Sequence, residues 1–182
     1  AFGYLTDFAL VGFVAGALSG AFIAAFISYC DIKLRMDQIA VGFVLTILCI
    51  DLSNYLGQEY VRINGPIVSK FSLPLISKIP FIGKILFNHS LITYFSILLI
   101  PSSWFFLNKT NLGLAIRASG ENPLAARSRG INVKKMRFIG TIIGGALLGL
   151  AGATFSLYTK YGWSESHTAN YGWIILAIVI FG

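Results

Sequence analysis

Residues 120–158, GENPLAARSRGINVKKMRFIGTIIGGALLGLAGATFSLY, decide the fold class, because a basic segment leads directly into a long apolar one. The first part, 120–137, holds five of the chain's fourteen Lys and Arg residues and one acidic residue, Glu121. The second part, 138–158, has no charged residue and as a helix would cross the ~30 Å hydrocarbon core of a bilayer. This pattern predicts a transmembrane helix that is entered from a basic loop.

The composition of the whole chain agrees with that prediction. Hydrophobic residues make up 56% of the 182 and charged residues 12%, with a mean hydropathy of +0.77. A soluble domain carries about 25% charged residues, so the chain is predicted to be an integral membrane protein. The net charge of +7 lies in loops between apolar runs and not on one basic face, which disfavours a nucleic-acid partner.

Five apolar segments predict an all-α, polytopic transmembrane helical bundle. We expect the chain to be an internal fragment of a longer membrane protein, with four full spans and a truncated fifth. The spans are expected at about 8–29, 38–56, 90–107, 138–158 and 171–182. Between them, an outside loop is expected at 57–89 and a cytoplasmic loop at 108–137, the latter with a short helix of its own.

The distribution of Lys and Arg predicts the orientation. If the first span ends in the cytoplasm, the inside loops hold nine of these residues and the outside loops hold five. The N-terminal end is therefore expected to face outward, and the loop 108–137 to be cytoplasmic.

Small residues at four-residue spacing predict where the helices pack. The first span contains such a series, and the fourth contains two neighbouring ones, which would let helix backbones approach closely. The residues expected at these contacts are Gly12, Gly16, Gly20, Gly144, Gly145 and Gly149.

The second span is the most polar. Polar groups inside a span usually face a water-filled path or a partner, and these suit a neutral, hydrogen-bonding solute better than an ion. The candidate path residues are Gln38, Thr46, Asp51 and Asn54. Asp51 lies toward the outer end of its span, so an interfacial carboxylate without a transport role remains an equal alternative.

Catalytic signals are absent from the sequence. The two His residues, His89 and His167, have no metal-ligand companion at helical spacing, and no G-x-S-x-G, H-E-x-x-H or phosphate-loop motif is present. We therefore predict no catalytic residue, no metal site and no cofactor bound by this chain.

The basic loop contains the signals of a short helix. Asn122 is placed to cap it, Pro123 suits its first position, and Gly130 suits the left-handed conformation that follows a helix end. A topology signal that touches anionic lipid headgroups would explain the charge, but not the cap, the Ala125-Ala126 pair or the closing glycine.

Three stretches resemble known transporters. Residues 110–153, TNLGLAIRASGENPLAARSRGINVKKMRFIGTIIGGALLGLAGA, resemble the coupling loop and following helix of ATP-binding-cassette importer permeases, in the branch for sugars, nucleosides and branched-chain amino acids. Residues 37–48, DQIAVGFVLTIL, resemble the same branch. Residues 72–94, SLPLISKIPFIGKILFNHSLITY, are most similar to simple-sugar and nucleoside permeases.

The resemblance implies a permease subunit whose short cytoplasmic helix docks into a groove on a separate ATPase, which would hold ATP and Mg²⁺. It also implies a second permease subunit, identical or related, an extracytoplasmic solute-binding protein, and a place in the cytoplasmic (inner) membrane of a bacterium. In permeases with an EAA loop, a Glu precedes the two alanines; Leu124 stands there in this chain. The ATPase-coupling residues implied are Glu121, Asn122, Pro123, Ala125, Ala126, Arg127 and Gly130.

Other functions stay open on the sequence alone. The leading prediction is an importer permease for a simple sugar or nucleoside, followed by a branched-chain amino acid permease. A secondary transporter or channel would need functional charges deep in the spans, where only Asp51 is found, and off centre. A membrane-embedded enzyme would need a catalytic cluster at one membrane face.

Overall fold

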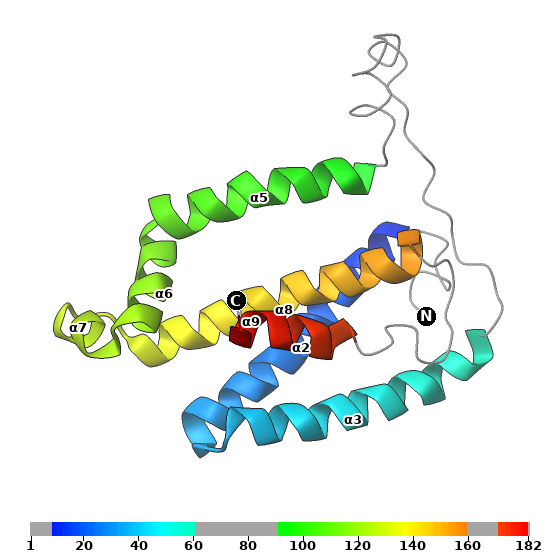
Figure 1. Cartoon of the computed structure of the whole chain (residues 1–182), viewed down its shortest axis with the longest axis horizontal. Coiled ribbons are helices and arrows are strands. Elements are labelled where there is room, and N and C mark those ends of the chain that lie inside the picture. Colours follow the sequence, from blue (N-terminus) through cyan, green and yellow to red (C-terminus); the bar gives the residue numbers. More distant parts are fainter. Residues whose placement is uncertain (1–8, 61–90, 160–170, 182) are drawn as a thin grey trace, which may run out of the picture.

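A computed structural model describes residues 9–60, 91–159 and 171–181, and every regular element in these ranges is a helix (Figure 1). The long helices are α2 (Ala9–Leu34), α3 (Gln38–Gly57), α5 (Leu91–Lys109) and α8 (Val133–Thr154). The shorter ones are α6 (Asn111–Glu121), α7 (Pro123–Ser128) and α9 (Tyr171–Phe181), with a 3-10 turn at Gln58–Tyr60 and a π-helical turn at Phe155–Thr159. The predicted all-α membrane bundle is therefore confirmed; the expected outside loop lies outside the described residues from 61 on.

The centre of the fold is a glycine seam between α2 and α8, which cross in antiparallel directions (Figure 1). A Cβ built on Gly16 would lie 2.9 Å from both the Gly149 carbonyl oxygen and the Ala153 Cβ. A Cβ on Gly20 would lie 2.9 Å from the Gly149 Cα, and one on Gly145 would meet Ala24. The backbones thus approach as only glycines allow, which is how membrane helices gain van der Waals contact.

The seam uses part of the expected glycine set. Gly16, Gly20, Gly145 and Gly149 lie in it, and Gly12 lies one turn before Gly16 on α2. Gly144 does not take part, since nothing lies within 4 Å of a Cβ built there. Of the two neighbouring stripes on α8, the one through Gly145 and Gly149 faces α2.

Helix α2 is longer than the expected first span, because it continues to Leu34. It ends where Arg35 adopts a left-handed φ of 56° and the Met36 N–H donates to the Cys30 carbonyl oxygen at 3.2 Å. Asp37 then begins α3, its side chain accepting from the Ile39 N–H at 2.8 Å. The connection between the first two expected spans is thus a turn of three residues at 35–37.

Apolar side chains cover the outside of the helices. Leu18, Phe22, Ile100 and Val179 are each 66–74% exposed. Within the described residues, three helical stretches are long and apolar enough to cross a membrane: Leu10–Leu34, Gln38–Gly57 and Val133–Leu157. Such surfaces are stable in lipid, where no water has to be excluded from them.

Candidate functional site

The loop expected between the third and fourth spans is largely helical and contains one helix more than the sequence analysis predicted. Helix α6 begins at Asn111 because the Thr110 side chain caps it, accepting from the Gly113 N–H at 3.0 Å. The same hydroxyl donates to the Phe106 carbonyl oxygen of α5 at 2.6 Å. Thr110 is an N-cap signal that the sequence already contained.

The α5–α6 corner is closely packed. A Cβ built on Gly113 would lie 2.7 Å from the Leu107 Cα, so only glycine fits without movement. On its other side α6 packs on α8: Ser119 is 1% exposed, and a Cβ on Gly140 would lie 3.2 Å from the Ile116 Cγ2. The position of α6 is therefore set by both α5 and α8.

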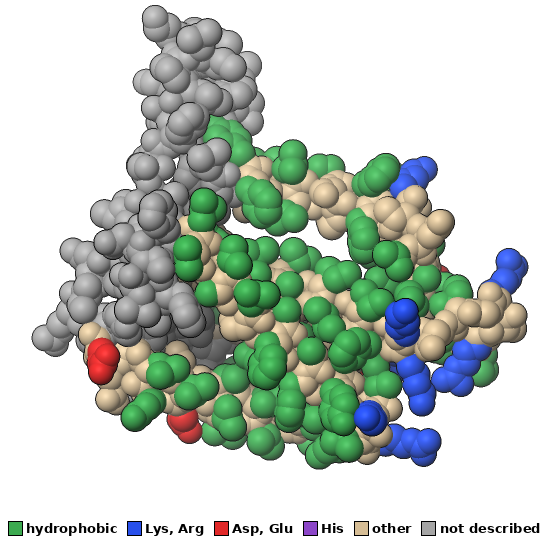
Figure 2. All heavy atoms as spheres, turned by 180° about the vertical axis from the view of Figure 1, so that it is seen from behind, with side chains coloured by type: hydrophobic (Ala, Val, Ile, Leu, Met, Phe, Trp, Pro, Cys, Tyr) green, Lys and Arg blue, Asp and Glu red, His purple; other side chains and the backbone are tan. Residues whose placement is uncertain are grey.

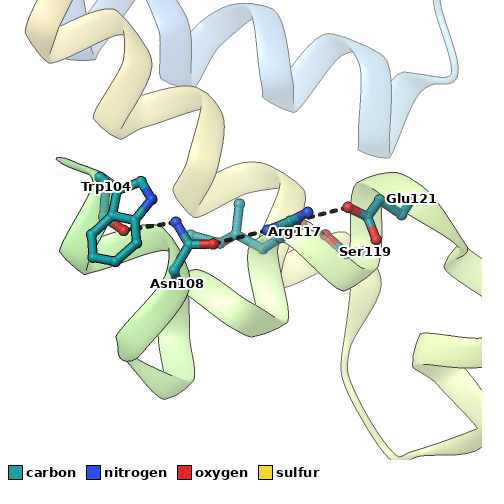
Figure 3. Close-up of polar contacts among 6 residues, drawn as sticks. Trp104, Asn108, Arg117, Ser119 and Glu121 are labelled. Atoms are coloured by element: carbon teal, nitrogen blue, oxygen red, sulfur yellow. Dashed lines mark hydrogen bonds and ion pairs between the residues drawn. The ribbon is translucent and has the colours of Figure 1, made fainter. Parts of the chain in front are cut away.

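A chain of polar contacts crosses the same corner (Figure 3). The Asn108 amide donates to the Trp104 carbonyl oxygen at 2.9 Å, and its Oδ1 accepts from Arg117 Nη1 at 2.9 Å. Arg117 Nε then pairs with Glu121 Oε1 at 2.7 Å. Both side chains of this pair are more than half exposed, so it contributes less than about 1 kcal/mol of stability. Glu121, expected to face a partner, is therefore already paired within the chain.

Helix α7 forms where the capping signals place it. The Asn122 side chain accepts from the Ala125 N–H at 3.1 Å, and Pro123 occupies the first helical turn. The chain leaves α7 through Gly130, whose φ of 78° is a conformation that side chains with a Cβ rarely adopt. The Ile131 N–H then donates to the Ala126 carbonyl oxygen at 3.0 Å.

The two alanines of α7 have different environments, although both were expected among the coupling residues. Ala126 is only 3% exposed and packs inside the chain. Ala125 and Arg127 are exposed, and Leu124 is 76% exposed. The residue that stands in place of the EAA glutamate is therefore the most prominent apolar side chain of α7, and the sequence analysis left it out.

A hollow of about 610 Å³ lies between α6 and α7. Its walls include Ala118 of α6 and Ala125 and Ala126 of α7, together with the charged side chains Glu121 and Arg129. The larger apolar side chains Leu114 and Ile131 also line it.

Basic side chains gather around this segment. Figure 2 shows the Lys and Arg side chains of the described residues at one end of the molecule, over α6 and α7 and the adjoining ends of the long helices. In the opposite direction α3 runs away from this end and carries Asp51, with Glu59 just beyond it (Figure 1). Asp31, Asp37 and Glu121 lie at the basic end as well, so only the Lys and Arg residues bear on orientation.

The four candidate path residues of α3 do not share a face. At about 100° per residue, Gln38 and Thr46 each lie about 140° round the helix from Asp51. Thr46 donates its hydroxyl to the Gly42 carbonyl oxygen at 2.7 Å, and Asn54 is half-buried. Asp51 lines a surface hollow of about 720 Å³ with apolar residues of the same helix. Among residues 9–60, 91–159 and 171–181, no three His, Cys, Asp or Glu side chains gather as metal ligands.

Comparison with known proteins places the whole chain in one group. Residues 2–182 match the family described as branched-chain amino acid transport system / permease component. The chain is 34% identical over 175 residues to the putative glucose ABC transporter permease protein TsgC13 of Haloferax volcanii, covering 94% of this chain and 53% of that protein. It is 37% identical over 187 residues to the nucleoside ABC transporter permease protein NupC of Lactococcus lactis, covering 100% of this chain and 58% of that protein.

A third relative is the guanosine ABC transporter permease protein NupQ of Bacillus subtilis, 35% identical over 182 residues that cover 95% of this chain and 55% of the relative. The chain thus spans little more than half the length of the relatives it matches. No solved structure matches the chain.

Proposed function

Because the chain belongs to the family of permease components of branched-chain amino acid transport systems, we propose that it forms part of the membrane-spanning subunit of an ATP-driven importer. It is an integral membrane protein with helices long and apolar enough to span a bilayer. The observation that carries the proposal is α7: a short, capped helix at the basic end that exposes Leu124 beside Arg127.

The proposed solute is a simple sugar or a nucleoside. Support comes from the names of the relatives, which are permeases for glucose, nucleosides and guanosine at 34–37% identity. The family description favours a branched-chain amino acid as the second candidate.

In the proposed mechanism α7 docks on a separate cytoplasmic ATPase subunit. Leu124 and Arg127 are three residues apart and therefore lie on one face of the helix, where they would present an apolar knob beside a positive charge. The ATPase would hold ATP and Mg²⁺, and this chain would bind neither. Because α6 follows α5, precedes α7 and also contacts α8, a displacement of α7 would be transmitted through α6 to both long helices.

The remaining partners follow from the importer architecture. A second permease subunit, identical or related, would complete the path, and an extracytoplasmic binding protein would deliver the solute. The polar side chains of α3 would meet the path over a wide arc of the helix, with Asp51 and Asn54 about 60° apart and Gln38 about 140° from Asp51. Their hydroxyl, amide and carboxylate groups would suit a neutral solute that forms hydrogen bonds.

Uptake by cells tests the proposal. A strain that lacks the full-length permease should lose uptake of a labelled nucleoside or of labelled glucose, and the restored gene should return it. Loss of labelled leucine uptake alone would support the second candidate. Unchanged uptake of all three would contradict an importer role for these solutes.

A further inference from the structure

A basic hollow lies away from α7, between the last turns of α2 and the first turn of α8. Its volume is about 330 Å³. Lys33 of α2 and Lys134 and Lys135 of α8 line it, so two helices supply its three positive charges. Tyr29 and Phe138 also line it and provide an apolar wall.

These lysines have no acidic partner in the part of the chain that the structure describes. The ion pair found there joins Arg117 and Glu121, and no carboxylate of those residues approaches Lys33, Lys134 or Lys135 within 4 Å. Lys33 Nζ lies instead 5.2 Å from the centre of the Tyr29 ring, a cation–π contact that leaves its charge available.

An aromatic stripe continues from the hollow along α2. Tyr29, Phe26 and Phe22 follow Lys33 at steps of four, three and four residues, so all four side chains lie on one face of the helix. Phe26 is 49% and Phe22 74% exposed. A positive group with an aromatic residue beside it, at the end of an apolar stripe, is the arrangement expected where a helix leaves the hydrocarbon core.

We propose that this hollow binds the headgroup of an anionic phospholipid. The three lysines would contact its phosphate, and one acyl chain would lie along Tyr29, Phe26 and Phe22. We choose an anionic lipid because its charge is complementary to the three lysines, and such lipids are attracted to basic residues at a membrane surface. The hollow also sits at the ends of two helices that are long and apolar enough to span a membrane, which is where lipid headgroups would lie. The inference does not depend on the transported solute or on docking at α7.

Native mass spectrometry of the purified full-length permease can measure this binding, with phosphatidylglycerol as the probe and phosphatidylcholine of the same chain length as the reference. Wild type should retain phosphatidylglycerol in preference to phosphatidylcholine. At low ionic strength each lysine should contribute about fivefold in affinity. The double variant Lys134→Gln/Lys135→Gln should therefore bind about 25-fold more weakly, and Lys33→Gln about fivefold more weakly.

The matched control, Arg127→Gln/Arg129→Gln, removes two charges from α7 at the same end of the molecule. It should leave lipid retention unchanged, and Lys134→Arg/Lys135→Arg should preserve it. If the glutamine double variant does not fold, Lys33→Gln and Tyr29→Leu still test the hollow.

Three results would overturn the proposal. Equal loss of lipid in the lysine and arginine variants would mean diffuse attraction without a site. Full retention of phosphatidylglycerol by the lysine variants, with loss of a co-purifying ATPase, would assign the hollow to a protein partner. Equal retention of phosphatidylcholine by wild type would remove the role of charge.

Discussion

At the scale of single residues, Leu124 and Ala126 have opposite environments on one short helix. Leu124 is 76% exposed, whereas Ala126 is 3% exposed. An exposed leucine on a basic, polar segment has no packing role within the described part of the chain, so it is available to a partner. Ala126 instead holds α7 against the rest of the segment, and a larger side chain there would displace the helix.

Replacing Leu124 with Ser should weaken association with the ATPase and reduce transport, because the apolar contact of α7 is removed. Burying a leucine stabilises a contact by about 1.5–3 kcal/mol, so binding should weaken roughly 10-fold to 100-fold. Co-purification of the ATPase with the full-length permease measures the effect. Leu112→Ser is the matched control, since Leu112 is 52% exposed on α6; an equal loss in both variants would contradict a specific role for Leu124.

Replacing Asn122 with Ala should loosen α7 by about 1 kcal/mol, because the Ala125 N–H loses its capping oxygen. Hydrogen–deuterium exchange of the peptide 120–132 should become faster. Asn122→Ser keeps an oxygen in place and should exchange nearly as wild type does. Unchanged exchange in the alanine variant would show that α7 does not depend on its cap.

At the scale of elements, two helix contacts among the described residues are close because glycines lack a side chain. One is the seam between α2 and α8, and the other is the corner between α5 and α6. Each contact has a nearby glycine on the same helix that touches nothing within 4 Å: Gly144 on α8 and Gly120 on α6. Substitutions at these two glycines serve as controls, because they show the general effect of replacing a helical glycine without disturbing a helix contact.

Gly149→Ala should destabilise the full-length protein by about 1–3 kcal/mol through overpacking, because the new Cβ would lie 3.2 Å from the Gly20 Cα and closer still to the Gly16 carbonyl group. Gly144→Ala should be neutral or slightly stabilising, since alanine favours the helix. Thermal unfolding in detergent compares them. A lower Tm for Gly144→Ala than for Gly149→Ala would contradict the seam.

Gly113→Ala should force α6 away from α5, with a similar destabilisation, and should reduce transport more than ATPase binding because α7 itself is intact. Gly120→Ala should leave both properties unchanged. Uptake and ATPase co-purification, measured together, test this. If Gly113→Ala reduced transport and ATPase co-purification to the same degree, the α5–α6 contact would be needed only for folding of this segment.

The sequence predicted these elements unevenly, for physical reasons. Caps and special backbone positions are local signals, so the sequence alone could place Asn122 and Pro123 at the start of α7 and Gly130 just after its end. The seam glycines could be found by spacing, but the choice between Gly144 and Gly145 depends on how α8 is rotated against α2. Helix α6 was missed because its Thr110 cap was not used. The exposure of Leu124 could not be predicted, because it depends on how α7 packs against α6.

At the scale of the whole molecule, the Lys and Arg side chains of the described residues gather at one end (Figure 2). The basic end carries α6 and α7, while α3 leads away from it to Asp51 and Glu59. Moving the basic end across a bilayer would require many unpaired charges to cross the hydrocarbon core, so the chain is expected to keep this end in the cytoplasm.

Cysteine labelling of intact cells tests that orientation. In full-length protein with Cys30 and Cys49 replaced by Ala, a membrane-impermeant maleimide should label Glu59→Cys from outside. Ser128→Cys should react only after the membrane is opened. The reverse pattern would place α7 outside the cell and exclude contact with a cytoplasmic ATPase.

The central claim is that the exposed face of α7 contacts the ATPase, and site-specific photo-crosslinking tests it most directly. A photoreactive amino acid at Leu124 of the full-length permease, irradiated in membranes that contain the co-expressed ATPase, should give a covalent permease–ATPase product. The same amino acid at the exposed Leu112 of α6 should give little or none. A crosslink from position 112 and none from position 124 would contradict the assignment of α7 as the docking element.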